Sequence, residues 1–314
     1  MRGIITVLMG ILLLVLCVVV LSGNYFFNRV ITRKGIAANV EQLQNADGVP
    51  DFLDFTRLMD KGWWERNNAQ RVFIESRDNL RLSGLYVKNH GGNNKVAILV
   101  HGYSASAKSM VLYAPTYYNM GFDVLAVDNR AHGESEGKYV GMGYLDSKDL
   151  LNWIDEVIKR KGDNCKIVLH GVSMGATTVD SMADKGLKNV KAIISDCAYD
   201  NAESIYTHLM KSEYGLGKFP LVNALNVVCK IRAGYYLSDA NIISNVANSQ
   251  VPILYFHGNE DTFVPVSMSK KLYAATPKHL RDICIFDKAG HGAAIIVENE
   301  NYINRMKAFV EKLA

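Results

Sequence analysis

Residues 166–180 read KIVLHGVSMGATTVD, and this stretch decides the fold that the sequence predicts. KIVLH is an apolar run typical of a buried strand, and the residues after GVSMG have the pattern of a helix. GVSMG itself, from Gly171 to Gly175, fits the pattern G-x-S-x-G. Glycines on both sides of a serine permit a tight, strained turn that exposes the hydroxyl. The stretch predicts a strand, a turn and a helix, with Ser173 as a nucleophile; the alternative is a small residue in an ordinary turn.

Short β-rich runs alternate with amphipathic helical patterns along the rest of the chain. Eight runs are predicted strands: RVFIES, RLSGLYVK, KVAILVHG, FDVLAVD, KIVLHG, VKAIISD, VPILYFHG and RDICIFD. The alternation predicts an α/β fold, with an eight-stranded, mostly parallel sheet covered by helices on both faces. The first two runs are joined by a short turn at Arg77, Asp78 and Asn79, so we expect an antiparallel hairpin at the edge of the sheet.

The interval from about residue 202 to 248 interrupts this alternation, because it has helical patterning but no clear strand. An insertion after a strand of an open sheet lies above the carboxyl edge, where ligands bind. We therefore predict a helical cap. Its candidate substrate-binding residues are Tyr206, His208, Met210, Tyr214 and Phe219. The alternative is that these side chains form the core of the cap itself.

Acyl transfer by a serine needs a base to deprotonate the hydroxyl and an acid to orient that base. His291 is the candidate base, because the glycines in AGHGAA let its imidazole reach back over the sheet edge. The candidate acids lie in the loop HGNEDTFVP, which follows a predicted strand and contains Glu260 and Asp261. The chain order nucleophile, acid, histidine is typical of one class of serine hydrolases.

The negative charge that develops during such an attack needs two preorganised backbone donors. One candidate is the amide of Met174, which follows the nucleophile at the positive end of the predicted helix. The other is the amide of Tyr103, in the loop HGYSAS after the strand KVAILV. His101 and Gly102 are predicted to shape that turn. No metal and no organic cofactor is expected for this chemistry.

The N-terminal segment is of a different kind, because Ile4 to Leu21 contains no charged residue. As a helix it would extend about 27 Å at ~1.5 Å per residue, close to the thickness of a bilayer's hydrocarbon core. We predict a membrane anchor at residues 1–30, followed by a helical lead-in at 31–70 and the main domain at 71–314. The alternative is a cleaved signal peptide, although the apolar region is longer than such peptides usually have.

Charge and cysteine content bear on partners and location. The formal charge of +4 comes from interspersed basic and acidic residues, without the basic stripe that a nucleic-acid backbone would need, so no nucleic-acid partner is expected. Arg29, Arg33 and Lys34 follow the apolar segment and only Arg2 precedes it, which favours a cytoplasmic domain. Many single-anchor proteins export their domain despite such a bias, so the sequence leaves the side of the membrane open. It does not specify an oligomeric state.

Taken together, the motifs HGYSAS, DNRAHGES, GVSMG, KIRAGYYLSDA, HGNEDTFVP and AGHGAA resemble the α/β-hydrolase superfamily over roughly residues 71–313. Within it they are similar to the membrane-anchored serine hydrolases of Firmicute bacteria. The resemblance implies the α/β-hydrolase fold and favours Asp261 over Glu260 as the acid. It also implies Ser173 as nucleophile, His291 as base, and Tyr103 and Met174 as oxyanion donors.

The activity expected from these residues is hydrolysis of a small or lipid-like carboxylic ester through an acyl-enzyme. One alternative is a serine peptidase of the same fold, for which a carboxylate cluster would have to grip a free amine. The charged cap residues Glu203, Glu213 and Asp239 do not form an obvious cluster in the sequence. Another alternative is a non-catalytic, membrane-anchored binding protein that has kept the fold.

Overall fold

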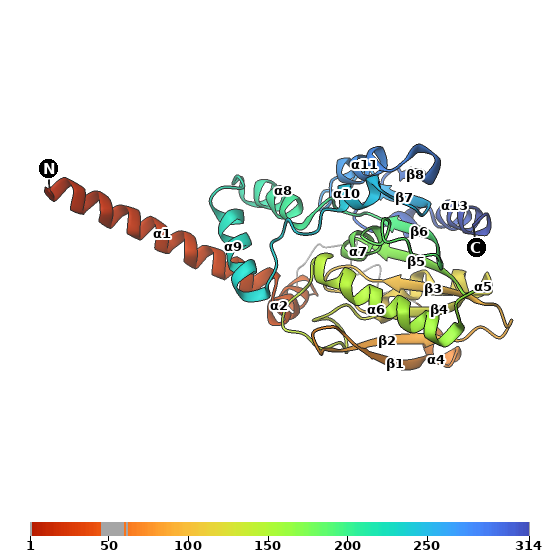
Figure 1. Ribbon diagram of the computed structural model, residues 1–314. Helices are drawn as coiled ribbons and strands as arrows, with labels where there is room; N and C mark the ends of the chain where they lie inside the picture. The colour runs from red at the N-terminus through yellow and green to blue at the C-terminus, as the bar shows by residue number, and fades with distance from the viewer. Residues whose placement is uncertain (1, 45–59, 61, 314) are drawn as a thin grey trace.

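The computed structural model describes residues 2–44, 60 and 62–313 of the chain. At its centre lies one eight-stranded sheet with the order β1-β2-β4-β3-β5-β6-β7-β8 (Figure 1). The strands are β1 (Gln70–Glu75), β2 (Arg81–Val87), β3 (Lys95–Val100), β4 (Asp123–Val127), β5 (Lys166–Val172), β6 (Val190–Asp196), β7 (Ile253–Gly258) and β8 (Arg281–Phe286). Each predicted run forms one of them.

The sheet is mixed, with its antiparallel part at one edge. β1 pairs antiparallel with β2, and β2 pairs antiparallel with β4. From β4 onward every neighbouring pair is parallel. The predicted mostly parallel sheet with an edge hairpin is therefore confirmed. Parallel strands present their carboxyl ends at one edge, and this edge receives the loops after β3, β5, β6, β7 and β8.

Both faces of the sheet are covered, because successive side chains of a strand point to opposite faces. On β3, Ala97 and Leu99 join one apolar cluster and Val96, Ile98 and Val100 join the other. The first cluster packs against α4 (Trp63–Arg66), η1 (Ala107–Leu112), α5 (Ala114–Asn119), α12 (Ala294–Val297) and α13 (Asn299–Glu311). The second packs against α6 (Tyr144–Lys161), α7 (Met174–Asp180), α10 (Ile242–Ala247) and α11 (Val266–Ala275). A short 3-10 helix, η2 (Lys278–Leu280), precedes β8.

The predicted cap interval lies between β6 and β7, which are neighbours in the sheet. It contains α8 (Ala202–Tyr214), α9 (Leu221–Ala233) and α10. Asn201 begins α8, because its side-chain oxygen accepts a hydrogen bond from the Ser204 amide at 2.8 Å. Ile242 and Val246 of α10 are buried in the cluster on the sheet face. Of these three helices, α8 and α9 stand away from the sheet.

The N-terminal apolar segment forms one long helix, α1 (Arg2–Val30), followed by α2 (Arg33–Gln44). By length and composition α1 could cross a membrane, and the apolar part that projects from the domain is exposed (Figure 1). Phe27 and Ile31, in contrast, are completely buried in a third apolar cluster with residues of α8 and α9. The predicted lead-in contains α2 and α4, and its residues 45–59 and 61 lie outside the described residues.

Candidate active site

Ser173 lies in the turn between β5 and α7 and has a strained backbone, with φ 56° and ψ −116°. Non-glycine residues rarely adopt such a positive φ, and where they do the surrounding structure must enforce it. The two neighbouring glycines are needed for close backbone approach. A Cβ on Gly171 would lie 2.1 Å from the carbonyl oxygen of Gly175, and one on Gly175 would lie 2.0 Å from that of Val100. The G-x-S-x-G pattern is thus explained by steric contact.

The loops after β7 and β8 bring two further side chains to this serine. His291 Nε2 lies 2.9 Å from Ser173 Oγ, and His291 Nδ1 lies 2.7 Å from Asp261 Oδ2. The three residues come from positions separated by 118 and 30 residues in the chain. Each of these distances is within hydrogen-bonding range. The structure therefore joins the serine, histidine and aspartate side chains in one continuous hydrogen-bonded line.

Asp261 is held by contacts on both of its carboxylate oxygens. Oδ1 accepts hydrogen bonds from the amides of Phe263, at 3.0 Å, and Val264, at 2.8 Å. Oδ2 accepts the hydrogen bond from His291 Nδ1 and also lies 3.2 Å from Nε2 of the fully buried His257. Burial opposes ionisation of this carboxyl, but the charge and hydrogen bonds of the two histidines outweigh it and hold the pKa of Asp261 well below its usual range. Asp261 is therefore an anion that orients the imidazole.

The loop after β3 lies directly against the serine. A Cβ added at Gly102 would be 3.3 Å from Ser173 Cβ, so the backbone that leads to Tyr103 passes beside the hydroxyl. Met174 is the first residue of α7, where backbone amides have no acceptor within the helix. The two candidate oxyanion donors thus belong to the two segments that flank Ser173.

Two neutral histidines fix the loop that carries Tyr103. Burial lowers the pKa of His101 to about 4, and burial together with the neighbouring His101 lowers the pKa of His132 to about 3. Both are therefore uncharged and can accept hydrogen bonds from backbone amides. His101 Nε2 accepts from the Asn129 amide at 3.0 Å, and His132 Nε2 accepts from the Ser104 amide at 3.2 Å.

The loop DNRAHGES after β4 is held together by ion pairs and local hydrogen bonds. Arg130 is almost completely buried and contacts Asp149 at 2.7 Å and Asp78 at 3.0 Å. Asp128 accepts hydrogen bonds from the amides of Ala107 and Glu134. The charges of this loop are thus paired within it and with its neighbours, and its contribution to the site is to hold His132.

The structure divides the five cap residues into two groups. Tyr206 and Met210 are 9% and 7% exposed and share a cluster with Met174 and Val264, beside the serine and the acid loop. His208 Nε2 donates to the carbonyl oxygen of Thr262 at 3.0 Å, which ties α8 to that loop. Tyr214 and Phe219 are 54% and 82% exposed and lie on the outside of the cap.

One thiol lies next to the three residues. The Sγ of Cys197 and ligand atoms of Asp261 and His291 are all within 4.8 Å of one another, a spacing that could admit a metal ion. Metal binding requires a thiolate. Burial raises the pKa of Cys197 well above its usual range, and the other two side chains are already hydrogen-bonded to each other. Their chemistry therefore fits a protonated packing thiol better than a metal ligand.

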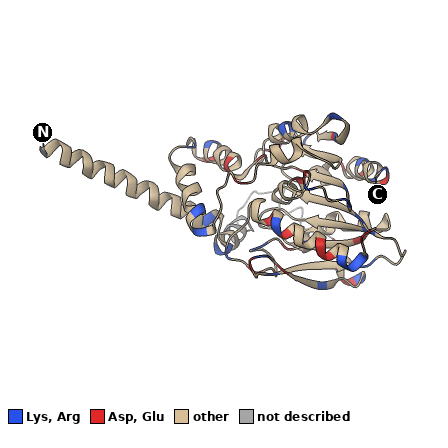
Figure 2. Cartoon of the chain, in the orientation of Figure 1, with Lys and Arg blue, Asp and Glu red and all other residues tan. Residues whose placement is uncertain are grey.

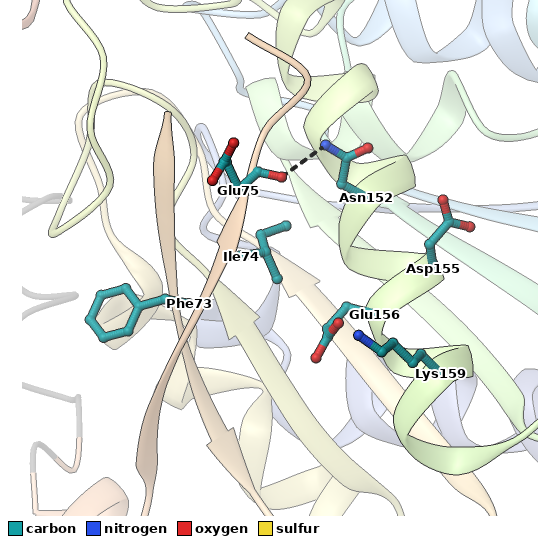
Figure 3. Close-up of a pocket in the computed structure, with 7 residues that line it drawn as sticks. All are labelled: Phe73, Ile74, Glu75, Asn152, Asp155, Glu156 and Lys159. Carbon is teal, nitrogen blue, oxygen red and sulfur yellow. Dashed lines mark hydrogen bonds between the residues drawn. The ribbon is translucent and has the colours of Figure 1, made fainter. Parts of the chain in front are cut away.

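A surface pocket of about 310 Å³ lies between β1 and α6, away from the carboxyl edge of the sheet (Figure 3). Phe73, Ile74 and Glu75 line it on the strand, and Asn152, Asp155, Glu156 and Lys159 line it on the helix. It contains none of the candidate site residues. The candidate triad lies instead at the carboxyl edge, where Ser173 is 6% exposed.

Sequence reasoning misses three contributors to the site. The sequence marks His257 only as the opening of a loop, yet its buried ring supports Asp261. Phe263 lies with its ring 5.0 Å from that of His291. Tyr103 donates a side-chain hydrogen bond to the carbonyl oxygen of Val30, at the end of α1. The histidine could have been found from its position at the end of an apolar strand; the other two contacts have no local signal.

The sheet order and the site geometry define an α/β-hydrolase fold, and comparisons with known proteins agree with this assignment. The family described as serine aminopeptidase, S33, matches residues 91–218, which include Ser173. The esterase Pf2001 of Pyrococcus furiosus is 25% identical, with a TM-score of 0.63 over 78% of this chain and 91% of the esterase. The predicted fold is confirmed. The proteins similar to this chain include an esterase and a lipase.

Two curated proteins are also similar to this chain. The uncharacterized protein YqkD of Bacillus subtilis is 25% identical over 254 residues, which are 80% of this chain and 82% of YqkD. The lysophosphatidylserine lipase ABHD12 of Danio rerio is 25% identical over 261 residues, which are 74% of this chain and 65% of the lipase.

Proposed function

We propose that the chain is a membrane-anchored serine hydrolase that cleaves carboxylic esters through an acyl-enzyme. The observation that carries this proposal is the line of hydrogen bonds from Ser173 Oγ through His291 to Asp261, at 2.9 and 2.7 Å. The position of Ser173 at the strained turn between β5 and α7 adds support, since such a turn presents the hydroxyl of the nucleophile.

In the first half of the proposed reaction, Ser173 Oγ attacks the ester carbonyl carbon while His291 Nε2 takes its proton. Asp261 holds Nδ1–H of the imidazole and stabilises the imidazolium. The amides of Tyr103 and Met174 donate to the oxyanion. When the tetrahedral intermediate collapses, the bond to the alcohol oxygen breaks, and the alcohol leaves with the proton from Nε2.

In the second half, water attacks the acyl-enzyme and gives its proton to His291 Nε2. Collapse of the second intermediate releases the carboxylic acid and returns the proton to Ser173. No other reactant is needed, and the enzyme ends in its starting protonation state.

The N-terminal helix is proposed as a lasting anchor, not a cleaved signal. The small residues at which a signal peptidase would cut, Ser22 and Gly23, lie in the middle of the continuous helix α1. Phe27, one turn further on, is completely buried against the cap. Residues on both sides of that position thus belong to one continuous helix, whose C-terminal part is packed against the domain.

An ester substrate is favoured by the apolar side chains above the serine and by the esterase and lipase relatives. The family match to a serine aminopeptidase supports a second candidate, a peptidase. Such an enzyme would need free carboxylates to hold the substrate's amine. Among the charged residues of the cap, Glu203 forms an ion pair with Lys218 at 3.0 Å, and Asp239 caps the backbone at Tyr236. Glu203 and Asp239 are thus engaged within the cap, and Glu213 lies exposed in the last turn of α8.

Labelling with a fluorophosphonate probe tests the nucleophile. Ser181 provides a matched control, because it lies just after the same helix and is also 6% exposed. The wild type and Ser181→Ala should be labelled, and Ser173→Ala should not. A folded wild type that takes up no probe, or Ser173→Ala labelled as strongly as the wild type, would disprove the serine mechanism.

The substrate class is tested with a chain-length series of aryl esters and with aminoacyl arylamides, each compared with Ser173→Ala. We expect turnover of the esters and little turnover of the arylamides. Faster turnover of the arylamides would replace the esterase proposal with the peptidase.

A further inference from the structure

Large apolar side chains are exposed together on the outer side of the cap. Leu216 and Phe219, in the loop between α8 and α9, are 45% and 82% exposed; Val227 and Ile231, on α9, are 53% and 77% exposed. These four residues are called the apolar cap surface below. Among the other described residues outside α1, Tyr214 and Tyr236 are also exposed in the cap region, at 54% and 41%, and the remaining ones, such as Phe73 and Val297, are scattered over the fold. Single exposed side chains are ordinary, whereas a group of them indicates an interaction surface.

The helix α9 is apolar on two sides. Leu225 and Cys229 point into the third cluster and are 4% and 0% exposed. Val227 and Ile231 are four residues apart, so they share another face, and that face is open. Packing inside the domain accounts for the first pair only. The second pair is left facing away from the domain.

Contacts between α9 and α1 place this surface next to the apolar segment. A Cβ added at Gly23 would lie 2.8 Å from Cβ of Ala224, and Arg232 donates to the side-chain oxygens of Asn24 and Asn28 at 2.6 and 2.8 Å. The two helices therefore run in the same direction along this contact. The loop that precedes α9 lies at the end of the domain from which α1 projects (Figure 1).

The charges around the surface are mostly positive. The cap helices and their connecting loop carry four basic residues, Lys211, Lys218, Lys230 and Arg232, and two acidic residues, Glu203 and Glu213. Figure 2 shows α1 without charge between Arg2 at its tip and its junction with α9, where Lys and Arg gather. Apolar side chains bordered by cations are complementary to a bilayer with anionic headgroups.

We propose that the apolar cap surface lies in a lipid bilayer beside α1, so that the cap over Ser173 is in contact with the membrane. The inference rests on the anchor part of the proposed function and not on the hydrolase activity. Its consequence for that activity is a preference for esters that reside in the bilayer, because they reach the cap without entering water.

A tryptophan reporter in the full-length chain tests the contact directly. The chain is reconstituted into phosphatidylcholine and phosphatidylglycerol vesicles, with or without bromine on the acyl chains near the headgroups. The fluorescence that Phe219→Trp adds to that of the wild type should lie at shorter wavelength than that of a tryptophan in water. About half or more of it should be quenched by the brominated lipid, because quenching requires contact with the bromine. Phe73→Trp, on the exposed edge strand β1, should show neither change.

Flotation of the same vesicles separates the possible failures. If the chain does not float with the lipid, the anchor assignment is wrong and the inference falls with it. If the chain floats but the reporter at position 219 stays solvent-like and unquenched, the anchor stands and the inference is overturned. A shift of the Phe219→Trp reporter's emission to shorter wavelength that grows with the ratio of protein to lipid, without quenching by brominated lipid, would assign the surface to a second copy of the chain instead. Fluorophosphonate labelling reports independently on the hydrolase proposal.

A second experiment measures the consequence for substrate use. Ile231→Glu is compared with Phe73→Glu on a soluble short-chain ester and on a long-chain ester carried in the vesicles. Charge at position 231 should lower turnover of the vesicle-borne ester about tenfold, in line with the loss of one large apolar contact with lipid, and leave the soluble ester unchanged. Phe73→Glu should affect neither. An equal loss on both esters, or no loss on the vesicle-borne ester, would overturn the inference.

Discussion

The carboxyl edge of the sheet and the region where α1 meets the cap are held together by different forces. At the sheet edge, steric contact and hydrogen bonds fix almost every functional atom: two glycines force the turn at Ser173, and Asp261 is held on both oxygens. Where α1 meets the cap, apolar packing dominates and polar links such as that of Arg232 are fewer. The proposed chemistry thus lies where steric contact and hydrogen bonds hold the chain, and the proposed access route lies where apolar packing holds it.

The largest expected effect comes from breaking the hydrogen-bonded line at the sheet edge. His291→Ala should lower kcat for a soluble ester by about 10³-fold or more, because the members of such a triad act as a unit. His279→Ala, which removes an exposed histidine, should leave kcat unchanged. Steady-state kinetics on the soluble ester measures both. A His291→Ala enzyme that keeps its activity would remove His291 from the mechanism.

The steric part of the comparison is tested at the glycines. Gly175→Ala places a Cβ 2.0 Å from a backbone oxygen, so we expect a loss of at least about 2 kcal/mol in the free energy of unfolding, together with lost fluorophosphonate labelling. Gly217→Ala, in the loop of the cap, meets nothing within 4 Å and should be neutral. Urea unfolding provides the measurement. Equal stability of the two variants would show that the turn is not sterically fixed.

A buried carboxyl near the sheet predicts how stability depends on pH. Burial raises the pKa of Asp180 from 3.8 to about 8. Between these values the folded chain holds a proton that the unfolded chain releases, so stability falls as pH rises, by about 1.4 kcal/mol per pH unit, and levels off above the folded pKa.

The asparagine of Asp180→Asn has no ionisable group, so this variant does not lose stability in this way as pH rises. Relative to wild type, its free energy of unfolding should therefore rise between about pH 5 and about pH 8. Asp155→Asn, at an exposed carboxylate on α6, should follow wild type across the same range. Urea unfolding at both pH values is the check, and parallel curves for wild type and Asp180→Asn would contradict the prediction.

The smallest expected effect lies at a hydrogen bond that links the two regions, from Tyr103 to Val30. Tyr103→Phe removes the donor to Val30, which should cost about 1 kcal/mol in stability. If that bond positions the proposed oxyanion donor, kcat should also fall about fivefold with KM unchanged.

Tyr235→Phe is the matched control, because Tyr235 also donates to a backbone carbonyl, that of Val140 at 2.6 Å. It should lose similar stability and keep its kcat. Equal kcat values for the two variants would show that the link between α1 and the loop after β3 is structural only.

The same contrast explains what could be predicted from the sequence. The strands were predictable because buried strands are apolar runs with turns at their ends, and the candidate triad because glycines mark the strained turn and the loop that carries His291. These are local constraints. The outward position of Phe219, the return of α10 to the sheet and the bond from Tyr103 to Val30 depend on packing between distant segments. Such contacts leave no periodic or spaced pattern in the chain.

The cap leaves the sheet after β6 and re-enters it at the adjacent strand β7, so its two ends are fixed by neighbouring positions in one scaffold. A segment of this kind can be exchanged between relatives without disturbing the register on either side. Here, however, α9 fits closely against Gly23, and its Arg232 donates hydrogen bonds to Asn24 and Asn28. A working chimera must therefore carry residues 23–36 along with the cap, and the two segments form one transplantable unit although about 165 residues of chain separate them.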